Sequence, residues 1–214
     1  MSNKSSVAII DYGSGNLKSV YNAIATLNIC KKITITDNID EIAQASHIIL
    51  PGVGAFADCM EGLKSRSGVI EQITKQAIEQ KKPLLGICVG MQILADSGQE
   101  NGFNLGLGFI AGEVQPIAES ENFDKSYKIP QIGWNNLEFK KKHAILEGVD
   151  ENCDVYFANS YRFVAKDEKS VIASVNYGCE IGAIIAKENI LGIQFHPEKS
   201  GEIGLKFLRN FILT

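Results

Sequence analysis

Residues 83–95 read Pro-Leu-Leu-Gly-Ile-Cys-Val-Gly-Met-Gln-Ile-Leu-Ala, and this stretch decides the fold. The short apolar run at residues 84–87 is typical of a strand buried in a parallel sheet. After Cys88 the apolar residues follow the spacing of one helix face, at Met91, Leu94 and Ala95. The stretch therefore predicts a strand that turns directly into a helix, with Cys88 at the junction.

Cys88 has a glycine two positions away on either side, Gly86 and Gly90. This is a G-x-C-x-G form of the nucleophile elbow, in which a Cβ atom at either glycine would clash where strand and helix nearly touch. A cysteine there lies at a helix N-terminus, where the dipole favours thiolate, and the N–H of Val89 can donate to an oxyanion. On this motif alone, a small apolar residue that ends a core strand is an equally good interpretation.

The composition is that of an ordinary globular protein. Of 214 residues, 45% are hydrophobic and 21% are charged, so we expect one large domain over residues 1–214. A net charge of −4 without a basic run argues against a nucleic-acid or membrane-surface partner. The five cysteines lack C-x-x-C spacing, which predicts neither disulfides nor a zinc site and suits a reducing cytoplasm. Residues 1–10 suit neither a signal peptide nor a membrane span.

The first half of the chain alternates short apolar strands with helices. Strands are expected at residues 7–10, 33–36 and 47–50, and helices at 17–27, 39–45 and within 57–80. This rhythm predicts a parallel sheet covered by helices on both faces, and ligands bind such sheets at the carboxyl ends of the strands.

The second half has a more antiparallel character. Residues 110–116 open it, and hairpin strands are expected at residues 137–139, 154–158, 171–176 and 181–187. A buried-type strand at residues 190–195 and an amphipathic helix at residues 203–213 close the chain.

Only one of the three histidines is expected at the carboxyl edge of the sheet. His47 begins a strand at its amino end, and we expect His143, in a lysine-rich turn, to be exposed. His196 follows a buried strand, and Glu198 is two residues further on, where an extended backbone puts both side chains on one side. A carboxylate can orient an imidazole toward a nucleophile, so His196 and Glu198 together with Cys88 predict a Cys-His-Glu triad.

The third strand ends in Pro-Gly-Val-Gly-Ala-Phe at residues 51–56. The two glycines let backbone N–H groups face outward beside the predicted elbow, which would supply a second oxyanion donor at Val53. An ordinary strand-to-helix turn is the alternative, because Pro-Gly pairs are common in turns.

Three motifs together resemble the class I, triad-type glutamine amidotransferases: Leu-Gly-Ile-Cys-Val-Gly-Met-Gln at residues 85–92, Pro-Gly-Val-Gly at 51–54 and Gln-Phe-His-Pro-Glu-Lys-Ser at 194–200. More narrowly, Asp-Tyr-Gly-x-Gly-Asn at residues 11–16 and Gly-Trp-Asn at 133–135 look like the glutaminase subunits of imidazole glycerol phosphate synthases. The resemblance implies a flavodoxin-like three-layer α/β/α sandwich whose central sheet is mostly parallel, with antiparallel additions in the second half. It implies glutamine as substrate, a (β/α)8-barrel cyclase as heterodimer partner, and neither cofactor nor metal.

Carried over position by position, the resemblance assigns roles to individual residues. Cys88, His196 and Glu198 match the catalytic residues, and Val53 and Val89 match the oxyanion donors. The positions that hold glutamine are Gly52, Gly54, Gln92, Glu100, Ser160 and Tyr161. The positions that meet the cyclase are Asn16, Trp134, Tyr156 and Lys199. Trp134, which follows a glycine, is expected on a loop, where an aromatic residue suits an interface anchor; a tryptophan of the core is the alternative.

The resemblance implies that ammonia from glutamine passes to the cyclase, which makes imidazole glycerol phosphate and an aminoimidazole ribotide in histidine biosynthesis. Two positions depart from the family pattern, because Gln131 and Asn159 stand where the family usually has histidine. A related glutaminase that feeds a sugar-modifying amidotransferase is therefore an alternative. Two more are a stand-alone γ-glutamyl cysteine hydrolase and an inactive scaffold subunit, which the intact triad argues against.

Overall fold

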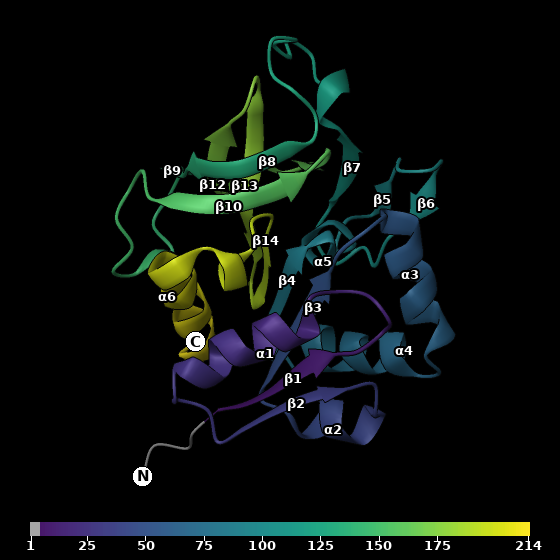
Figure 1. Ribbon diagram of the computed structural model, residues 1–214. Coiled ribbons are helices and arrows are strands. Elements are labelled where there is room, and N and C mark those ends of the chain that lie inside the picture. The colour runs from purple at the N-terminus through teal and green to yellow at the C-terminus, as the bar shows by residue number, and fades with distance from the viewer. Residues whose placement is uncertain (1–4) are drawn as a thin grey trace.

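The computed structural model describes residues 5–214, and a large mixed sheet forms its centre (Figure 1). The sheet has eight strands in the order β2-β1-β3-β4-β14-β13-β12-β9. Its first five strands are parallel to one another, and they are β2 (Lys32–Thr36), β1 (Ser6–Ile10), β3 (His47–Gly52), β4 (Leu84–Cys88) and β14 (Ile190–Ile193). These strands are rich in isoleucine and leucine and are buried except for β2 at the edge, as expected of a sheet covered on both faces.

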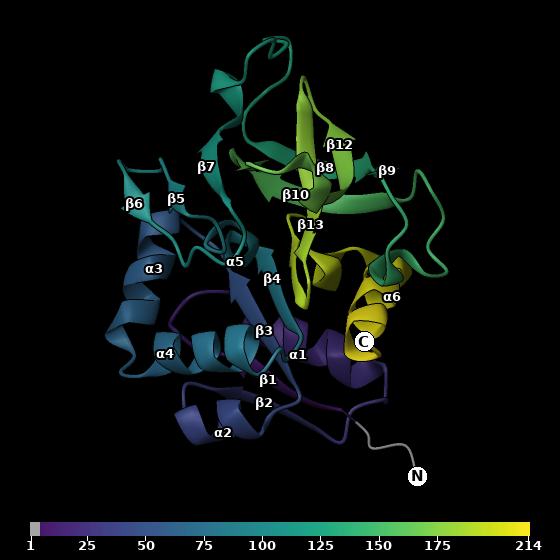
Figure 2. The same cartoon turned by 180° about the vertical axis from the view of Figure 1, so that it is seen from behind.

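Helices cover both faces of this parallel half. The helices α1 (Leu17–Thr26) and α6 (Gly201–Ile212) pack against each other in front of the sheet in Figure 1. From behind, Figure 2 shows the other helical layer, which includes α2 (Ile39–Gln44), α3 (Phe56–Ser65) and α4 (Val69–Thr74). The α/β/α layers and the mostly parallel sheet confirm the predicted fold class. The helix expected within residues 57–80 is divided into α3, α4 and a π-helical turn, η1 (Lys75–Glu79).

The second half extends the sheet with antiparallel strands, as predicted. The added strands are β13 (Glu180–Lys187), β12 (Val171–Asn176) and β9 (Glu138–Phe139). Two smaller sheets lie beside them, one of β10 (Asp154–Asn159) and β8 (Gln131–Asn136), the other of β11 (Tyr161–Ala165), β7 (Gly112–Pro116), β5 (Ser97–Gly98) and β6 (Asn104–Leu105). Single 3-10 turns connect these elements, at η2 (Ile117–Glu119), η3 (Ala144–Leu146), η4 (Glu168–Ser170) and η5 (Pro197–Lys199).

Two local expectations were wrong. The glycine before Trp134 suggested a loop, but Trp134 lies inside β8, because the backbone there pairs with β10 along its whole length. The helix expected to continue to Ala95 is the single turn α5 (Val89–Gln92). It ends early because the carbonyl groups of residues 93–95 accept hydrogen bonds from the N–H groups of residues 107–109 instead of continuing the helix. Within residues 5–214, no helix is both long and apolar enough to cross a membrane.

The turn from β4 into α5 depends on backbone packed directly on backbone. A Cβ atom added to Gly90 would lie 1.8 Å from the carbonyl oxygen of Leu50 in β3. One added to Gly86 would lie 2.4 Å from the carbonyl oxygen of Gly90, so both elbow glycines are required where the sequence predicted them. This contact fixes the first turn of α5 against β3, and it thereby fixes the position of Cys88.

Replacing Gly90 with alanine should therefore destabilise the protein strongly. No side-chain rotation can relieve a clash between Cβ and backbone, so we expect Gly90→Ala to lower the free energy of unfolding by about 3 kcal/mol or more. Urea unfolding followed by circular dichroism measures the change. Gly182→Ala in β13 is the control, because the added Cβ atom would have its nearest neighbour 3.7 Å away. Equal stability of the two variants would show that α5 does not depend on this close approach.

Candidate active site

Cys88 is held in a strained backbone conformation at the carboxyl edge of the sheet. It is the last residue of β4 and precedes α5, with φ 54° and ψ −115°, a region that non-glycine residues rarely adopt. The register places Cys88 beside Gly52 of β3 and Ile87 beside Ile193 of β14. Cys88 is buried, and it ends the strand that lies between β3 and β14.

His196 and Glu198 follow β14 at the same edge. Nδ1 of His196 lies 2.9 Å from Oε1 of Glu198, and both side chains are almost completely buried. The contact agrees with the sequence prediction, but its geometry differs, because residues 197–199 form the 3-10 turn η5 and not an extended strand. The His196 N–H donates to the carbonyl oxygen of Tyr156 at 2.9 Å, and the Ser200 hydroxyl donates to the carbonyl oxygen of His196 at 2.6 Å. The backbone of the histidine is therefore anchored on both sides.

The pKa of His196 reports its surroundings. Burial alone would lower it, but the hydrogen bond and charge of Cys88 and of Glu198 outweigh burial and raise the pKa to about 9. His196 is thus an imidazolium near pH 7, with the sulfur of Cys88 and the carboxylate of Glu198 as its two partners. A buried cysteine paired with an imidazole that a carboxylate orients is the arrangement of nucleophilic catalysis at a carbonyl group.

A cavity of about 180 Å³ opens above Cys88. Most of the residues predicted to contact the substrate or the oxyanion line this cavity, namely Gly54, Val89, Gln92, Glu100, Ser160 and Tyr161. Burial raises the pKa of Glu100, although its Oε2 accepts a hydrogen bond from the N–H of Phe56 at 2.8 Å. Because a carboxylate and a nucleophile line one small cavity, the site suits a ligand that carries a cation at one end and a carbonyl at the other.

Gly52 and Val53 do not line this cavity. The N–H of Val53 donates to the hydroxyl of Ser14 at 3.2 Å, and the same hydroxyl donates to the carbonyl oxygen of Val53 at 2.6 Å. The predicted second oxyanion donor is thus engaged by Ser14. Val89 begins α5 and lines the cavity, and the first N–H groups of a helix have no partner within the helix, so the N–H of Val89 is the predicted donor that remains at the cavity.

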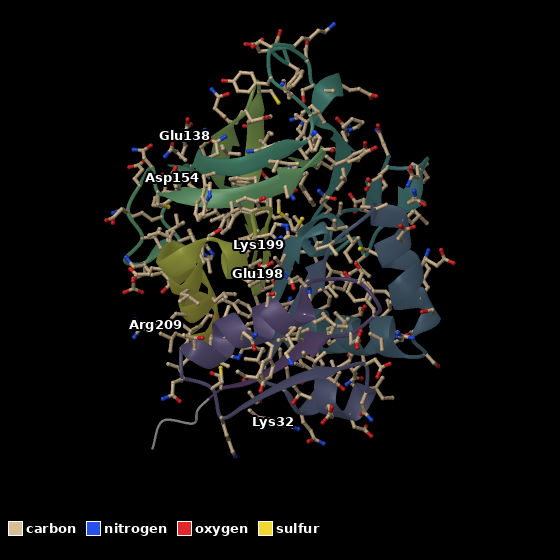
Figure 3. The ribbon with its side chains drawn as sticks, viewed as in Figure 1. Lys32, Glu138, Asp154, Glu198, Lys199 and Arg209 are labelled. Atoms are coloured by element: carbon tan, nitrogen blue, oxygen red, sulfur yellow. The ribbon has the colours of Figure 1, made fainter. Side chains whose placement is uncertain are left out.

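Three of the four residues matched to a partner surface form a cluster. Trp134 and Tyr156 are cross-strand neighbours in β8 and β10, with ring centroids 6.0 Å apart. Nζ of Lys199 lies 5.7 Å from the centre of the Tyr156 ring, and Figure 3 labels Lys199 and Glu198 beside β10. Trp134 is 58% exposed. Asn16 belongs to another element and immediately precedes α1.

Three residues without a predicted role contact the site. Ser14 binds Val53, Ser200 anchors His196, and Gln194 reaches the sulfur of Cys88. The sequence could have marked Gln194 as a candidate, because it directly follows an apolar strand, and a side-chain amide is unusual at a completely buried position. Ser14 and Ser200 gave no such signal, since serine is common in turns.

The fold and the site define a cysteine-dependent amidotransferase. The family model of class-I glutamine amidotransferases matches residues 8–214, and the chain belongs to this family. More particularly, it is 44% identical to the imidazole glycerol phosphate synthase subunit HisH of Rhodospirillum rubrum, over 96% of this chain and 97% of that one. It is 43% identical to the HisH subunit of Zymomonas mobilis, over 97% and 95%.

Solved structures agree on the fold. The structure of PurLQS from Thermotoga maritima superimposes with a TM-score of 0.72, covering 98% of each chain at 22% sequence identity.

The raised pKa of His196 predicts how stability depends on pH. A group whose pKa is higher in the folded than in the unfolded protein contributes its full stabilisation below the unfolded value, here 6.5, and loses it as pH rises through about 9. We therefore expect the free energy of unfolding to fall between pH 6.5 and 9, and to fall less in His196→Gln. Urea unfolding at several pH values measures both; parallel curves would contradict the assignment.

Proposed function

We propose that this chain is the glutaminase subunit of an imidazole glycerol phosphate synthase. The observation that carries the proposal is the 44% identity to a HisH subunit over nearly the whole of both chains. The proposal treats residues 1–214 as one cytoplasmic glutamine amidotransferase domain and gives the catalytic roles to Cys88, His196 and Glu198. The contact of His196 with Glu198 and the place of Cys88 at the cavity wall support those roles.

In the first half of the reaction, the Cys88 thiolate attacks the side-chain amide carbon of glutamine. The negative charge that develops on the carbonyl oxygen is stabilised by the N–H of Val89 at the start of α5. The imidazolium of His196 gives its proton to the departing nitrogen, so that the C–N bond breaks, ammonia leaves and a glutamyl thioester remains. Glu198 keeps the imidazole oriented throughout.

In the second half, water replaces ammonia. The neutral His196 takes a proton from water while the water oxygen adds to the thioester carbonyl carbon. The C–S bond then breaks, and its electron pair goes to sulfur. Glutamate leaves, and the thiolate and the imidazolium are restored. The negative charge of Glu100, at the cavity wall, complements the positive charge of the α-ammonium group of glutamine.

Ammonia released into water near neutral pH becomes ammonium, which is not a nucleophile. A subunit that supplies a synthase must therefore pass neutral ammonia into a partner through an enclosed route. The proposed partner is a cyclase subunit with a (β/α)8 barrel, and the proposed contact surface is the cluster of Trp134, Tyr156 and Lys199, with Asn16. Large exposed aromatic residues are frequent anchors of such interfaces.

Cys88→Ala tests the activity. Without the nucleophile no thioester can form, so we expect glutaminase turnover, measured as glutamate formed with the cyclase and its phosphoribosyl substrate present, to fall by roughly three orders of magnitude or more. We expect the wild-type subunit to turn over slowly alone and to be activated by the loaded cyclase. Equal turnover with and without the partner would contradict the assignment and favour a stand-alone hydrolase.

Trp134→Ala tests the partner surface. Loss of a large aromatic anchor should weaken binding of the cyclase by about 2 kcal/mol, or about 30-fold in Kd, measured by titration calorimetry. Leu213→Ala is the matched control, because Leu213 is 61% exposed but lies beyond the end of α6. An unchanged Kd for Trp134→Ala would remove β8 from the proposed interface.

A further inference from the structure

Gln194 is a completely buried amide that contacts the sulfur of Cys88. It directly follows β14, between Ile193 and Phe195, which are also completely buried. Its own N–H donates to the carbonyl oxygen of Ala183 at 2.8 Å, which holds the backbone in the sheet. Nε2 of Gln194 lies 3.8 Å from Sγ of Cys88, within hydrogen-bonding distance for sulfur. Burying an amide in an apolar layer is costly unless its polar atoms have partners, and here Cys88 is one of them.

The other end of the Gln194 amide is held by Gln92. Nε2 of Gln92 donates to Oε1 of Gln194 at 3.0 Å. If the Gln194 amide were turned over, its NH₂ group would face the NH₂ group of Gln92, donor against donor. The contact therefore sets Gln194 with its nitrogen, and not its oxygen, toward the sulfur.

The orientation of Gln92 is fixed in turn. Its Nε2 also lies 3.4 Å from the carbonyl oxygen of Tyr161, which accepts a hydrogen bond from Nδ2 of Asn159 at 3.0 Å. A carbonyl oxygen can only accept, so the nitrogen of Gln92 must be the atom that faces it. Hydrogen-bond direction is thus defined at each step from Tyr161 through Gln92 and Gln194 to Cys88.

We propose that Gln194 is a further catalytic residue, whose amide N–H stabilises negative charge on the Cys88 sulfur, and that Gln92 is the positioning residue that orients it. The inference rests on the proposed function, in which that sulfur is a thiolate before attack and again after the thioester breaks. A hydrogen bond to the charged form of a group favours that form, and the effect is larger in a buried site. Gln194 therefore assists both formation of the nucleophile and departure of the thiolate from the thioester.

Gln194→Met tests this role, because methionine keeps the length of the side chain and removes the N–H. The readout is the rate at which iodoacetamide alkylates Cys88 as a function of pH, followed by mass spectrometry of the peptide that contains it. Alkylation requires the thiolate but forms no oxyanion, so it reports on the sulfur alone. We expect the midpoint of the profile to move to higher pH in Gln194→Met. With the cyclase bound, we expect kcat for glutamine to fall tenfold to a hundredfold and KM to change less than about threefold.

The control is Gln76→Met. Gln76 is another buried glutamine, 5% exposed, but it lies on η1 and away from the cavity. Both its alkylation profile and its kcat should equal those of the wild type, so that a change in Gln194→Met is not a general effect of removing a buried amide.

Gln92→Met keeps the test decisive if Gln194→Met fails to fold. Freeing the Gln194 amide should move the alkylation profile in the same direction by a smaller amount, whatever happens to glutamine binding. Wild-type profiles in the folded variants, or a loss of kcat without a shift of the profile, would overturn the role of Gln194. If the wild-type complex hydrolyses no glutamine, the proposed function fails instead, and the alkylation result still decides whether Gln194 acts on the sulfur.

Discussion

The close packing of α5 on β3 is the constraint on which the site depends. Gly52, Gly86 and Gly90 leave no room for a Cβ atom, and the two backbones approach so nearly that Cys88 must leave the strand at a positive φ. The conformation is unfavourable for a cysteine, but the surrounding sheet fixes it, because β4 is paired on both sides, with β3 and with β14. Strain at this residue therefore serves to point the sulfur out of the sheet and into the cavity.

The same sheet also positions the other groups that act on the sulfur of Cys88. Because β14 is the neighbour of β4, the residues that follow β14 emerge next to Cys88. Gln194 contacts its sulfur there, and His196 follows two residues further on. One is a neutral donor and the other an imidazolium, so the sulfur is surrounded by groups that favour its negative charge. The pairing of two parallel strands thus brings together three of these groups, one at the end of β4 and two in the segment just after β14.

Tyr156 belongs to the exposed aromatic cluster and also holds the backbone of His196. The carbonyl oxygen of Tyr156 accepts the N–H of His196, its N–H donates to Ser200 at 3.0 Å, and its ring lies between Trp134 and Lys199. A partner that covers these side chains would contact β10, the strand that anchors His196. This gives the proposed activation by a partner a direct physical route, through the backbone of β10.

The parts of the site that follow from strand order could be predicted from the sequence, and the parts that depend on side-chain direction could not. The apolar runs and the glycine spacing predicted β4 and the elbow, and the place of His196 after a buried strand predicted that it emerges at the same edge of the sheet as Cys88. The engagement of Val53 by Ser14 and the orientation of Gln194 depend on rotations that no spacing encodes. The early end of α5 could not be predicted for a similar reason. The N–H groups that bind the carbonyl groups of residues 93–95 are more than ten residues away in the chain.

The two residues that depart from the family pattern are neighbours in the structure. Gln131 and Asn159 are directly opposite each other in β8 and β10, and both are buried. Side chains at opposite positions of an antiparallel pair lie in contact range, so a change of one alters the space and polarity available to the other. Both amide atoms of Gln131 and Oδ1 of Asn159 are buried without a hydrogen-bond partner among the described residues. The two departures therefore count as a single coupled change beside the cavity, and they argue less strongly for a different acceptor than two independent changes would.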